Sequence, residues 1–97
     1  MFIIVWRSTT DDPAAFEEHY GPDGTWVRLF RRSGDFVRTD LLKGADAYLT
    51  LDWWTSLEAY NAFRDEYAEE YARVGAACEA VTTFEEKLGE YRYSPRT

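Results

Sequence analysis

Residues 48–63 read YLTLDWWTSLEAYNAF and contain two periodicities, one after the other. Apolar and polar side chains alternate over residues 48–54, which predicts a β-strand. Residues 55–58 then read TSLE, a capping-box pattern that favours the start of a helix. Beyond it, apolar side chains recur every three or four positions from Tyr60 to Val81, so we expect one long amphipathic helix.

Strand signals continue on both sides of this segment. Residues 36–42 alternate in the same way, and the turn signal at 43–44 predicts that they form a hairpin with the next strand. Residues 2–7 are apolar at odd and even positions, which predicts a first strand buried on both faces. Residues 82–93 predict a last strand, bent near Gly89.

A helical region follows the first strand. Residues 11–13 read DDP, which supplies an N-cap acid and a proline at the first helical position. Residues 21–24 read GPDG, so we expect an elbow there between two short helices. The second of them is predicted over residues 25–32, before Ser33 and Gly34.

The order strand, helix, strand, strand, helix, strand predicts a ferredoxin-like α+β fold. In this βαββαβ arrangement a four-stranded antiparallel sheet carries its helices on one face. We expect residues 1–97 to form a single domain, with 93–97 as a flexible tail.

The aromatic content predicts a homodimer. The chain has four Trp, seven Tyr and six Phe in 97 residues. Each large ring buries roughly 150–250 Å², so helices on one sheet face cannot cover them all. We therefore expect the other sheet face to pack against the same face of a second copy, closing a dimeric α+β barrel with isologous symmetry.

The charge balance excludes several classes of partner. Eleven Lys and Arg stand against eighteen Asp and Glu, a formal net charge of −7, so we expect no nucleic acid partner. The longest apolar run, residues 2–6, is far shorter than the roughly 20 residues of a membrane span, so we expect no membrane association. A single cysteine and the lack of a signal-peptide pattern favour a cytoplasmic location.

Metal and nucleophile chemistry have few candidates. The one His and the one Cys stand far apart with no ligand spacing around them, so we expect no metal site. Cys78 lies on the apolar stripe of the predicted long helix and is expected to be an inert core residue. His19 could act as a general base near pH 7, and the alternative is a half-exposed helical histidine without a role.

The rings on the inner side of the predicted fold form the strongest collective signal. Tyr67 and Tyr71 on the long helix are brought near Trp53 and Trp54 at the end of the preceding strand. Buried Tyr and Trp need partners for their polar atoms, so this set predicts a cavity for a planar aromatic ligand. Trp26 could point its indole N–H into the same cavity. The alternative is that the rings only fill a core and a dimer interface.

The 48–63 segment resembles the third-strand-to-helix segment of the antibiotic biosynthesis monooxygenase-like family of dimeric α+β barrels, in its Trp, Ser and Ala-Tyr positions. Residues 20–30 and 39–42 also resemble members of that family, so the similarity covers most of the chain. It implies a homodimer in which each subunit holds a pocket between its sheet and its helices.

The resemblance also implies a chemistry. In the family's characterised enzymes oxygen is inserted into phenolic polyketides without metal, flavin or haem, so no cofactor is expected. The reaction requires a base for the phenol proton, donors for the phenolate and a dry pocket. The residues expected to supply these functions are His19, Trp54, Tyr67 and Tyr71 as catalytic groups, and Trp26, Arg31 and Phe63 as substrate-binding groups.

Another branch of the family degrades haem, with an Asn on the first strand, a Trp at the end of the third and a His on the second helix. Trp54 matches that tryptophan. Trp6 and Arg7 stand where the Asn is expected, and the second helical region has no His, so haem cleavage is disfavoured.

The sequence therefore predicts a cofactor-independent monooxygenase acting on an aromatic, phenolic or quinol-type small molecule. The alternatives are a non-catalytic dimeric module that binds a hydrophobic small molecule, and a structural dimer whose own rings fill its pockets. An enclosed cavity of roughly several hundred Å³ reached by His19, Trp54 and Tyr67 would favour ligand chemistry.

Overall fold

The structure is a computed structural model that describes residues 1–94. Its elements in chain order are β1 (Phe2–Thr9), α1 (Pro13–Tyr20), α2 (Thr25–Phe30), β2 (Phe36–Lys43), β3 (Tyr48–Trp54), α3 (Leu57–Glu66), α4 (Ala68–Cys78), the 3-10 helix η1 (Glu79–Val81) and β4 (Phe84–Arg92). Met1 and Tyr93 exchange two backbone hydrogen bonds of 2.8 Å, one residue beyond the paired ends of β1 and β4. Residues 95–97 of the predicted tail lie outside the described residues.

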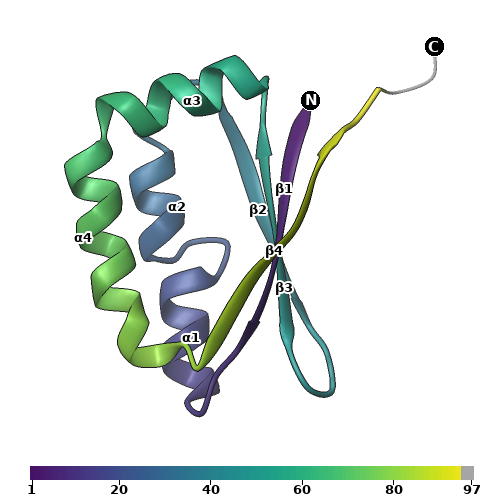
Figure 1. The fold of residues 1–97 in the computed structure, drawn as a ribbon, viewed down its shortest axis with the longest axis vertical. Coiled ribbons are helices and arrows are strands. Elements are labelled where there is room, and N and C mark those ends of the chain that lie inside the picture. Colours follow the sequence, from purple (N-terminus) through teal and green to yellow (C-terminus); the bar gives the residue numbers. More distant parts are fainter. Residues whose placement is uncertain (95–97) are drawn as a thin grey trace.

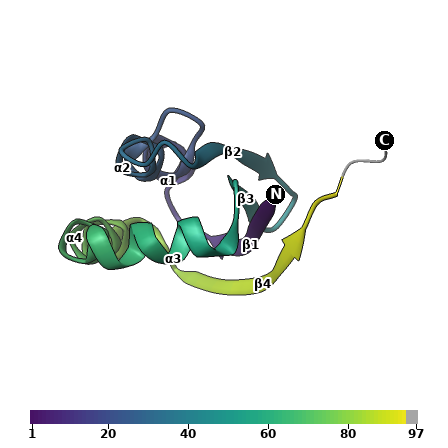
Figure 2. The same ribbon diagram turned by 90° about the horizontal axis from the view of Figure 1, so that it is seen from above.

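The four strands form one antiparallel sheet in the order β2-β3-β1-β4. β1 pairs with both β3 and β4, so the first and last strands of the chain are neighbours. The helices all lie on one side of this sheet (Figures 1 and 2). The ferredoxin-like α+β fold predicted from the element order is therefore confirmed. No helix within residues 1–94 combines the length and apolar character needed to cross a membrane.

The elbow between α1 and α2 lies where the sequence predicts it. Asp12 caps α1, its Oδ1 accepting a hydrogen bond of 3.2 Å from the Ala15 N–H. A Cβ at Gly24 would lie 2.7 Å from the carbonyl oxygen of His19, so the close approach of the two helices requires glycine there. α2 ends at Phe30, two residues earlier than expected.

The prediction of one long helix was wrong, because the structure divides it into α3 and α4 at Tyr67. The φ and ψ of Tyr67, −110° and 31°, leave the helical region. Hydrogen bonds of 2.9 Å still cross this point, from the Tyr67 N–H to Phe63 O and from the Tyr71 N–H to Tyr67 O. The chain therefore bends rather than stops, with α3 across one end of the sheet and α4 alongside α2 (Figure 1). Apolar spacing continues through the bend, so periodicity alone does not reveal it.

The N-cap of α3 lies one residue later than the capping-box pattern indicates. Ser56 is the cap, and its Oγ accepts a hydrogen bond of 3.1 Å from the Ala59 N–H. Thr55 is instead held by Asp35, which accepts from its backbone N–H at 2.9 Å and from its hydroxyl at 3.0 Å. These two hydrogen bonds join the residue before β2 to the residue after β3, so the pairing of the hairpin continues through Thr55. The N-cap of α3 is therefore Ser56 rather than Thr55.

The side chains of β3 alternate as predicted, and the buried ones face the helices. Trp54 is fully buried, with ring centroids 5.4 Å from Phe30, 5.3 Å from Tyr60 and 5.0 Å from Phe63. The residues that form the apolar core around it are Phe2, Ile4, Leu29, Phe30, Tyr60 and Phe63. One half of the inner sheet face is therefore a closed aromatic core.

The outer sheet face is open and carries apolar side chains beside the Arg38–Asp40 ion pair. Leu42 and Tyr91 are 51% and 53% exposed on it. None of the described helices lies on this side (Figure 2). The pairing of β1 with β4 shifts by one residue between Val5 and Trp6, which leaves Leu88 as the extra residue of a bulge, next to the predicted bend.

Replacement of Trp54 should test the position of the core. Trp54→Ala is expected to lower the free energy of unfolding by about 3–5 kcal/mol, because it leaves a cavity where the helices meet the sheet. Asp65→Ala, on the exposed side of α3, is the control and should change it by less than about 0.5 kcal/mol. Urea unfolding followed by far-UV circular dichroism measures both, and equal losses would contradict the assignment.

Candidate functional site

A cavity of about 40 Å³ lies between the sheet and the helices. Its lining residues are Trp6 from β1, Thr39 from β2, Thr50 and Asp52 from β3, Glu85 from β4, Tyr20 from α1, Trp26 and Phe30 from α2, and Tyr71 from α4. All four strands thus contribute to it. The cavity forms where the polar half of the inner sheet face meets aromatic rings carried by the helices.

A wider groove of about 470 Å³ adjoins this cavity on the side of α4 and β4. The two spaces share four lining residues: Tyr20, Trp26, Tyr71 and Glu85. Apart from Tyr71, α4 presents only small side chains to the groove, namely Ala72, Gly75 and Ala76. The enclosed part of the site is therefore small, and most of its volume lies in the open groove.

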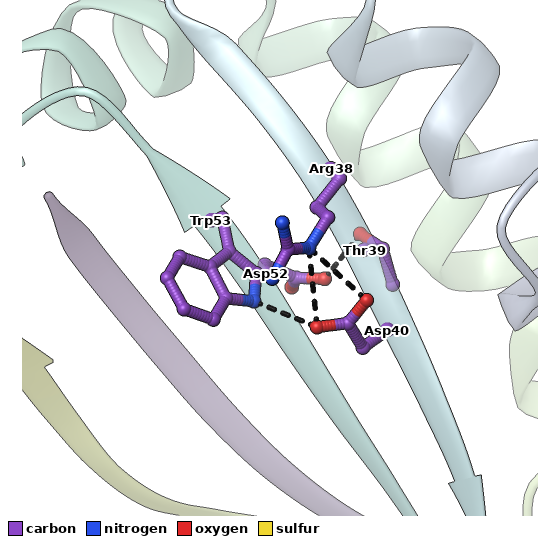
Figure 3. A network of polar contacts seen from close by, with 5 residues as sticks. All are labelled: Arg38, Thr39, Asp40, Asp52 and Trp53. Atoms are coloured by element: carbon purple, nitrogen blue, oxygen red, sulfur yellow. Dashed lines mark hydrogen bonds and ion pairs between the residues drawn. The ribbon is translucent and has the colours of Figure 1, made fainter. Parts of the chain in front are cut away.

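Asp52 lies at the inner end of the site and is only 9% exposed. Its Oδ1 accepts a hydrogen bond of 2.7 Å from the Thr39 hydroxyl, and no other donor among residues 1–94 reaches this carboxylate (Figure 3). Burial raises the pKa of Asp52 from its ordinary 3.8 to about 6; the Thr39 bond lowers it, and the nearby Glu85 raises it slightly. Asp52 therefore gains and loses a proton close to neutral pH.

A second polar group on the same two strands faces the opposite way. Asp40 accepts hydrogen bonds from Arg38 Nε at 3.2 Å and from Trp53 Nε1 at 3.0 Å (Figure 3). The Arg38 guanidinium also lies 4.4 Å from the centre of the Trp53 ring. Asp40 thus has cationic and N–H partners on the outer face, which Asp52 lacks on the inner one.

Tyr20 and Glu85 meet at the boundary between cavity and groove. The Tyr20 hydroxyl donates to Glu85 Oε2 at 3.2 Å and lies 3.3 Å from the Thr82 hydroxyl. Burial is the main cause that raises the pKa of Tyr20 above its ordinary value, so this phenol stays protonated at neutral pH. Glu85 itself is exposed on its groove side.

Tyr71 and Trp26 form the aromatic wall opposite the sheet. Their ring centroids are 4.9 Å apart. Burial raises the pKa of Tyr71 as well, so it too is a neutral phenol. The Trp26 Nε1 is buried near the Tyr20 hydroxyl and the Cys78 thiol, and it makes no hydrogen bond of ordinary geometry within the described part of the chain.

Of the residues predicted for the site, Trp26 and Tyr71 line the cavity. Trp54 and Phe63 lie in the apolar core, 0% and 2% exposed. Tyr67 packs its ring on Phe63, with centroids 5.1 Å apart, and lines neither the cavity nor the groove. The predicted aromatic layer is therefore only partly formed, because Trp53 lies on the outer sheet face against Arg38 and only Trp26 and Tyr71 reach the open space. The expected enclosed cavity of several hundred Å³ reached by His19, Trp54 and Tyr67 is not formed, since the enclosed space is about 40 Å³ and none of these three residues lines it.

His19 and Arg31 lie away from the cavity. The His19 Nδ1 is 2.8 Å from the Thr25 hydroxyl at the start of α2. Arg31 pairs with Asp23 of the elbow at 3.2 Å, on the exposed surface. Both side chains thus brace the elbow between α1 and α2.

Seven of the nine lining residues were not among the predicted site residues. Three are aromatic, Trp6, Tyr20 and Phe30, and four are polar, Asp52, Thr39, Thr50 and Glu85. The alternation over residues 48–54 contained the signal, since it places Thr50 and Asp52 on one face together with Trp54. Hydrophobicity alone predicts that Leu49, Leu51 and Trp53 form the buried face of β3. That assignment would place Thr50 and Asp52 on the solvent side and so would miss them as site residues.

Ligands for a metal are not gathered anywhere in residues 1–94, where no three His, Cys, Asp or Glu side chains converge. Cys78 is buried, 1% exposed, as its place on the apolar stripe predicts. Burial raises the pKa of its thiol, which keeps it protonated.

Neither a protein-family model nor a curated protein matches this sequence. Solved structures do match, and they show that the chain has the fold of the antibiotic biosynthesis monooxygenases. One is a Nitrosomonas europaea protein named for that family, with 13% identity, coverage of 96% of this chain and 98% of that one, and a TM-score of 0.67.

A second match is SnoaB, a cofactor-independent oxygenase from Streptomyces nogalater. It is 23% identical to this chain, the alignment covers 98% of this chain and 94% of SnoaB, and the TM-score is 0.77. A structure of a SnoaB variant gives a TM-score of 0.78 over the same coverage. The fold implied by the resemblance of residues 48–63 is thereby confirmed.

The protonation of Asp52 should be measurable as a dependence of stability on pH. Its pKa is higher in the folded chain than the ordinary 3.8, so its contribution to stability is complete below that value and is lost as the pH rises through about 6. Asp52→Asn removes this loss and should raise the free energy of unfolding at pH 7 by on the order of 1–3 kcal/mol.

Urea unfolding of both proteins between pH 4 and pH 8 measures the difference. Asp46→Asn, in the exposed turn between β2 and β3, is the matched control and should follow the wild type at every pH. A difference between wild type and Asp52→Asn that does not change with pH would show that this carboxyl titrates in its ordinary range.

Proposed function

We propose that this protein is a cofactor-independent monooxygenase that oxidises a phenolic or quinol-type aromatic molecule. The observation that carries the proposal is a single buried carboxylate, Asp52, at the inner end of an aromatic-lined cavity. Such a group is a general base whose proton affinity suits work near neutral pH. The likeness in fold to SnoaB, a cofactor-independent oxygenase, supports the same chemistry.

The proposed reaction needs only substrate and dioxygen. Asp52 accepts the phenolic proton, and the resulting phenolate reduces dioxygen through a ring carbon that forms a C–O bond as a peroxide. The peroxide takes up the proton from Asp52, and loss of the hydrogen on the oxygenated ring carbon then cleaves the O–O bond, which releases water and leaves a second carbonyl on the ring. For 1-naphthol the balance is C₁₀H₈O + O₂ → C₁₀H₆O₂ + H₂O, and the substrate supplies all the electrons.

The surroundings of Asp52 suit each step. Thr39 orients the carboxylate through its 2.7 Å hydrogen bond. The buried N–H of Trp26, which makes no hydrogen bond of ordinary geometry, would donate to a phenolate oxygen, and its ring and that of Tyr71 would shield the inner space from water. A cavity of about 40 Å³ admits dioxygen and the edge of a ring, so the rest of the substrate would lie in the groove.

We also propose that the protein acts as a homodimer joined through its outer sheet faces. The apolar side chains of that face, such as the 51% exposed Leu42, have no cover from the helices. Isologous packing of two copies would bury them and leave the groove between α4 and β4 on the helix side free. Two independent sites per dimer would result.

A non-catalytic module that binds a hydrophobic small molecule is the second candidate. The observation in its favour is that most of the free volume lies in the groove, away from Asp52. In that case ligands would bind and quench tryptophan fluorescence without oxygen uptake.

Oxygen uptake with 1-naphthol tests the proposed activity. The wild-type protein should consume one dioxygen per 1,4-naphthoquinone formed, with kcat/KM rising as the pH increases through about 6. Asp52→Asn should lower kcat by roughly 100-fold or more, because the base is lost. Asp46→Asn should keep the wild-type rate.

Two outcomes would contradict this assignment. Equal rates for wild type and Asp52→Asn would remove Asp52 as the base. Saturable binding of 1-naphthol with no oxygen uptake at any pH from 5 to 9 would favour the non-catalytic module.

The dimer is tested by light scattering after gel filtration at micromolar concentration. We expect twice the chain mass of 11.3 kDa. Leu42→Glu, on the exposed outer face, should shift the mass toward that of one chain, because it places a charge in the apolar contact. A wild-type protein of one chain mass would exclude the proposed assembly.

A further inference from the structure

The walls of the site carry negative charge and no positive charge. Among the described residues that line the cavity and the groove, none is Lys, Arg or His. Three are carboxylates: Asp52 at the inner end, Glu85 at the boundary and Glu79 at the outer edge of the groove. An anionic ligand would therefore meet repulsion along its whole path.

Within residues 1–94 the negative charge of Asp52 is not balanced by a cation. The one hydrogen bond that these residues give it comes from the neutral Thr39 hydroxyl, and the charged neighbour that influences it is another carboxylate, Glu85. A buried carboxylate normally has a cationic partner or gives up its charge. Asp52 therefore favours a ligand group that is neutral or cationic over one that is anionic.

The aromatic rings around the carboxylates add to the same preference. Trp6, Tyr20, Trp26 and Tyr71 all line the cavity. Ring faces attract cations, most strongly where water is excluded. Arg64 lies 3.9 Å from the centre of the Tyr71 ring and Lys87 lies 5.8 Å from that of Trp6.

Those two basic residues do not neutralise the site. Lys87 pairs with Glu90 at 3.6 Å, and Arg64 donates to the Tyr60 hydroxyl at 3.1 Å. Neither lines the cavity or the groove. Their positions against Tyr71 and Trp6 show that these rings attract cations. The ring surface that lines the cavity and the groove, and the carboxylates there, can contact a ligand.

We infer that the site takes an aromatic molecule that carries a protonated amine, with its ring against Trp26 and Tyr71 and its ammonium group against Glu85. Glu85 lines both spaces and is exposed to the groove, so it can meet a charged group that stays partly hydrated. Asp52, deeper in the site, then meets the opposite end of the ring. The inference deepens the proposed function, on which it rests for the phenol at that inner end.

Three probes with one ring system and different charge test the inference: 1-naphthylmethylamine, 1-naphthylmethanol and 1-naphthoate. Isothermal titration calorimetry at pH 7.5 should give the tightest Kd for the protonated amine and the weakest for the carboxylate, with at least a tenfold difference between them. Glu85→Gln should reduce that ratio by about fivefold. Glu86→Gln, the neighbouring residue on the opposite face of β4, makes the same change in net charge and should leave the ratio unchanged.

Equal affinities for the amine and the carboxylate, or no binding of any probe at millimolar concentration, would overturn the inference. So would a charge preference that Glu85→Gln and Glu86→Gln weaken equally, because it would come from the net charge of the protein rather than from the site. The outcome is separable from that of the proposed function. A preference for the amine without oxidation of 1-naphthol would support the inference and contradict the monooxygenase assignment. Oxidation of 1-naphthol without a preference for the amine would support the monooxygenase assignment and contradict the inference.

Discussion

The spacing of Trp54 and Asp52 along β3 is the constraint on which the rest of the structure depends. The two residues face the same side of the sheet with one residue between them, so about 7 Å of strand separates the centre of the core from the buried carboxylate. Trp54 fixes the position of β3 against Phe30 and Phe63. The cavity is consequently built directly beside the buried aromatic core, which fixes the strand that carries Asp52.

Local sequence patterns predict the fold well because they reflect local causes. Caps, turns and alternation indicate the ends of α1, the elbow before Gly24 and the hairpin of β2 and β3, and each is set by residues within a few positions. The bend at Tyr67 depends on where α3 and α4 pack, which is a tertiary property. The same holds for the face of β3: residues 48–54 alternate in either orientation, and only the position of the helices shows which set is buried.

The candidate site was predicted only in part, because the buried face of β3 is a tertiary property that local patterns do not reveal. Tyr71 was predicted from helical spacing and Trp26 from the polar N–H of its ring after the elbow, whereas the polar residues of the inner sheet face were not predicted. An aspartate in an apolar strand usually marks the solvent side. Here Asp52 keeps its burial at a cost in stability, since its ionisation is opposed by desolvation and by Glu85. Such a cost is typical of residues retained for function rather than for folding.

The bend at Tyr67 also separates two helices, α3 and α4, that differ in how many of their side chains pack into the core. α3 contributes Tyr60 and Phe63 to the core, whereas Cys78 is the one buried residue of α4. The free energy of local opening follows the number of such contacts, so α4 belongs to a weaker cooperative unit than α3. α4 is also the wall of the groove. Local opening of α4 would therefore widen the groove while Trp54 and Asp52, which lie on β3, stay in place.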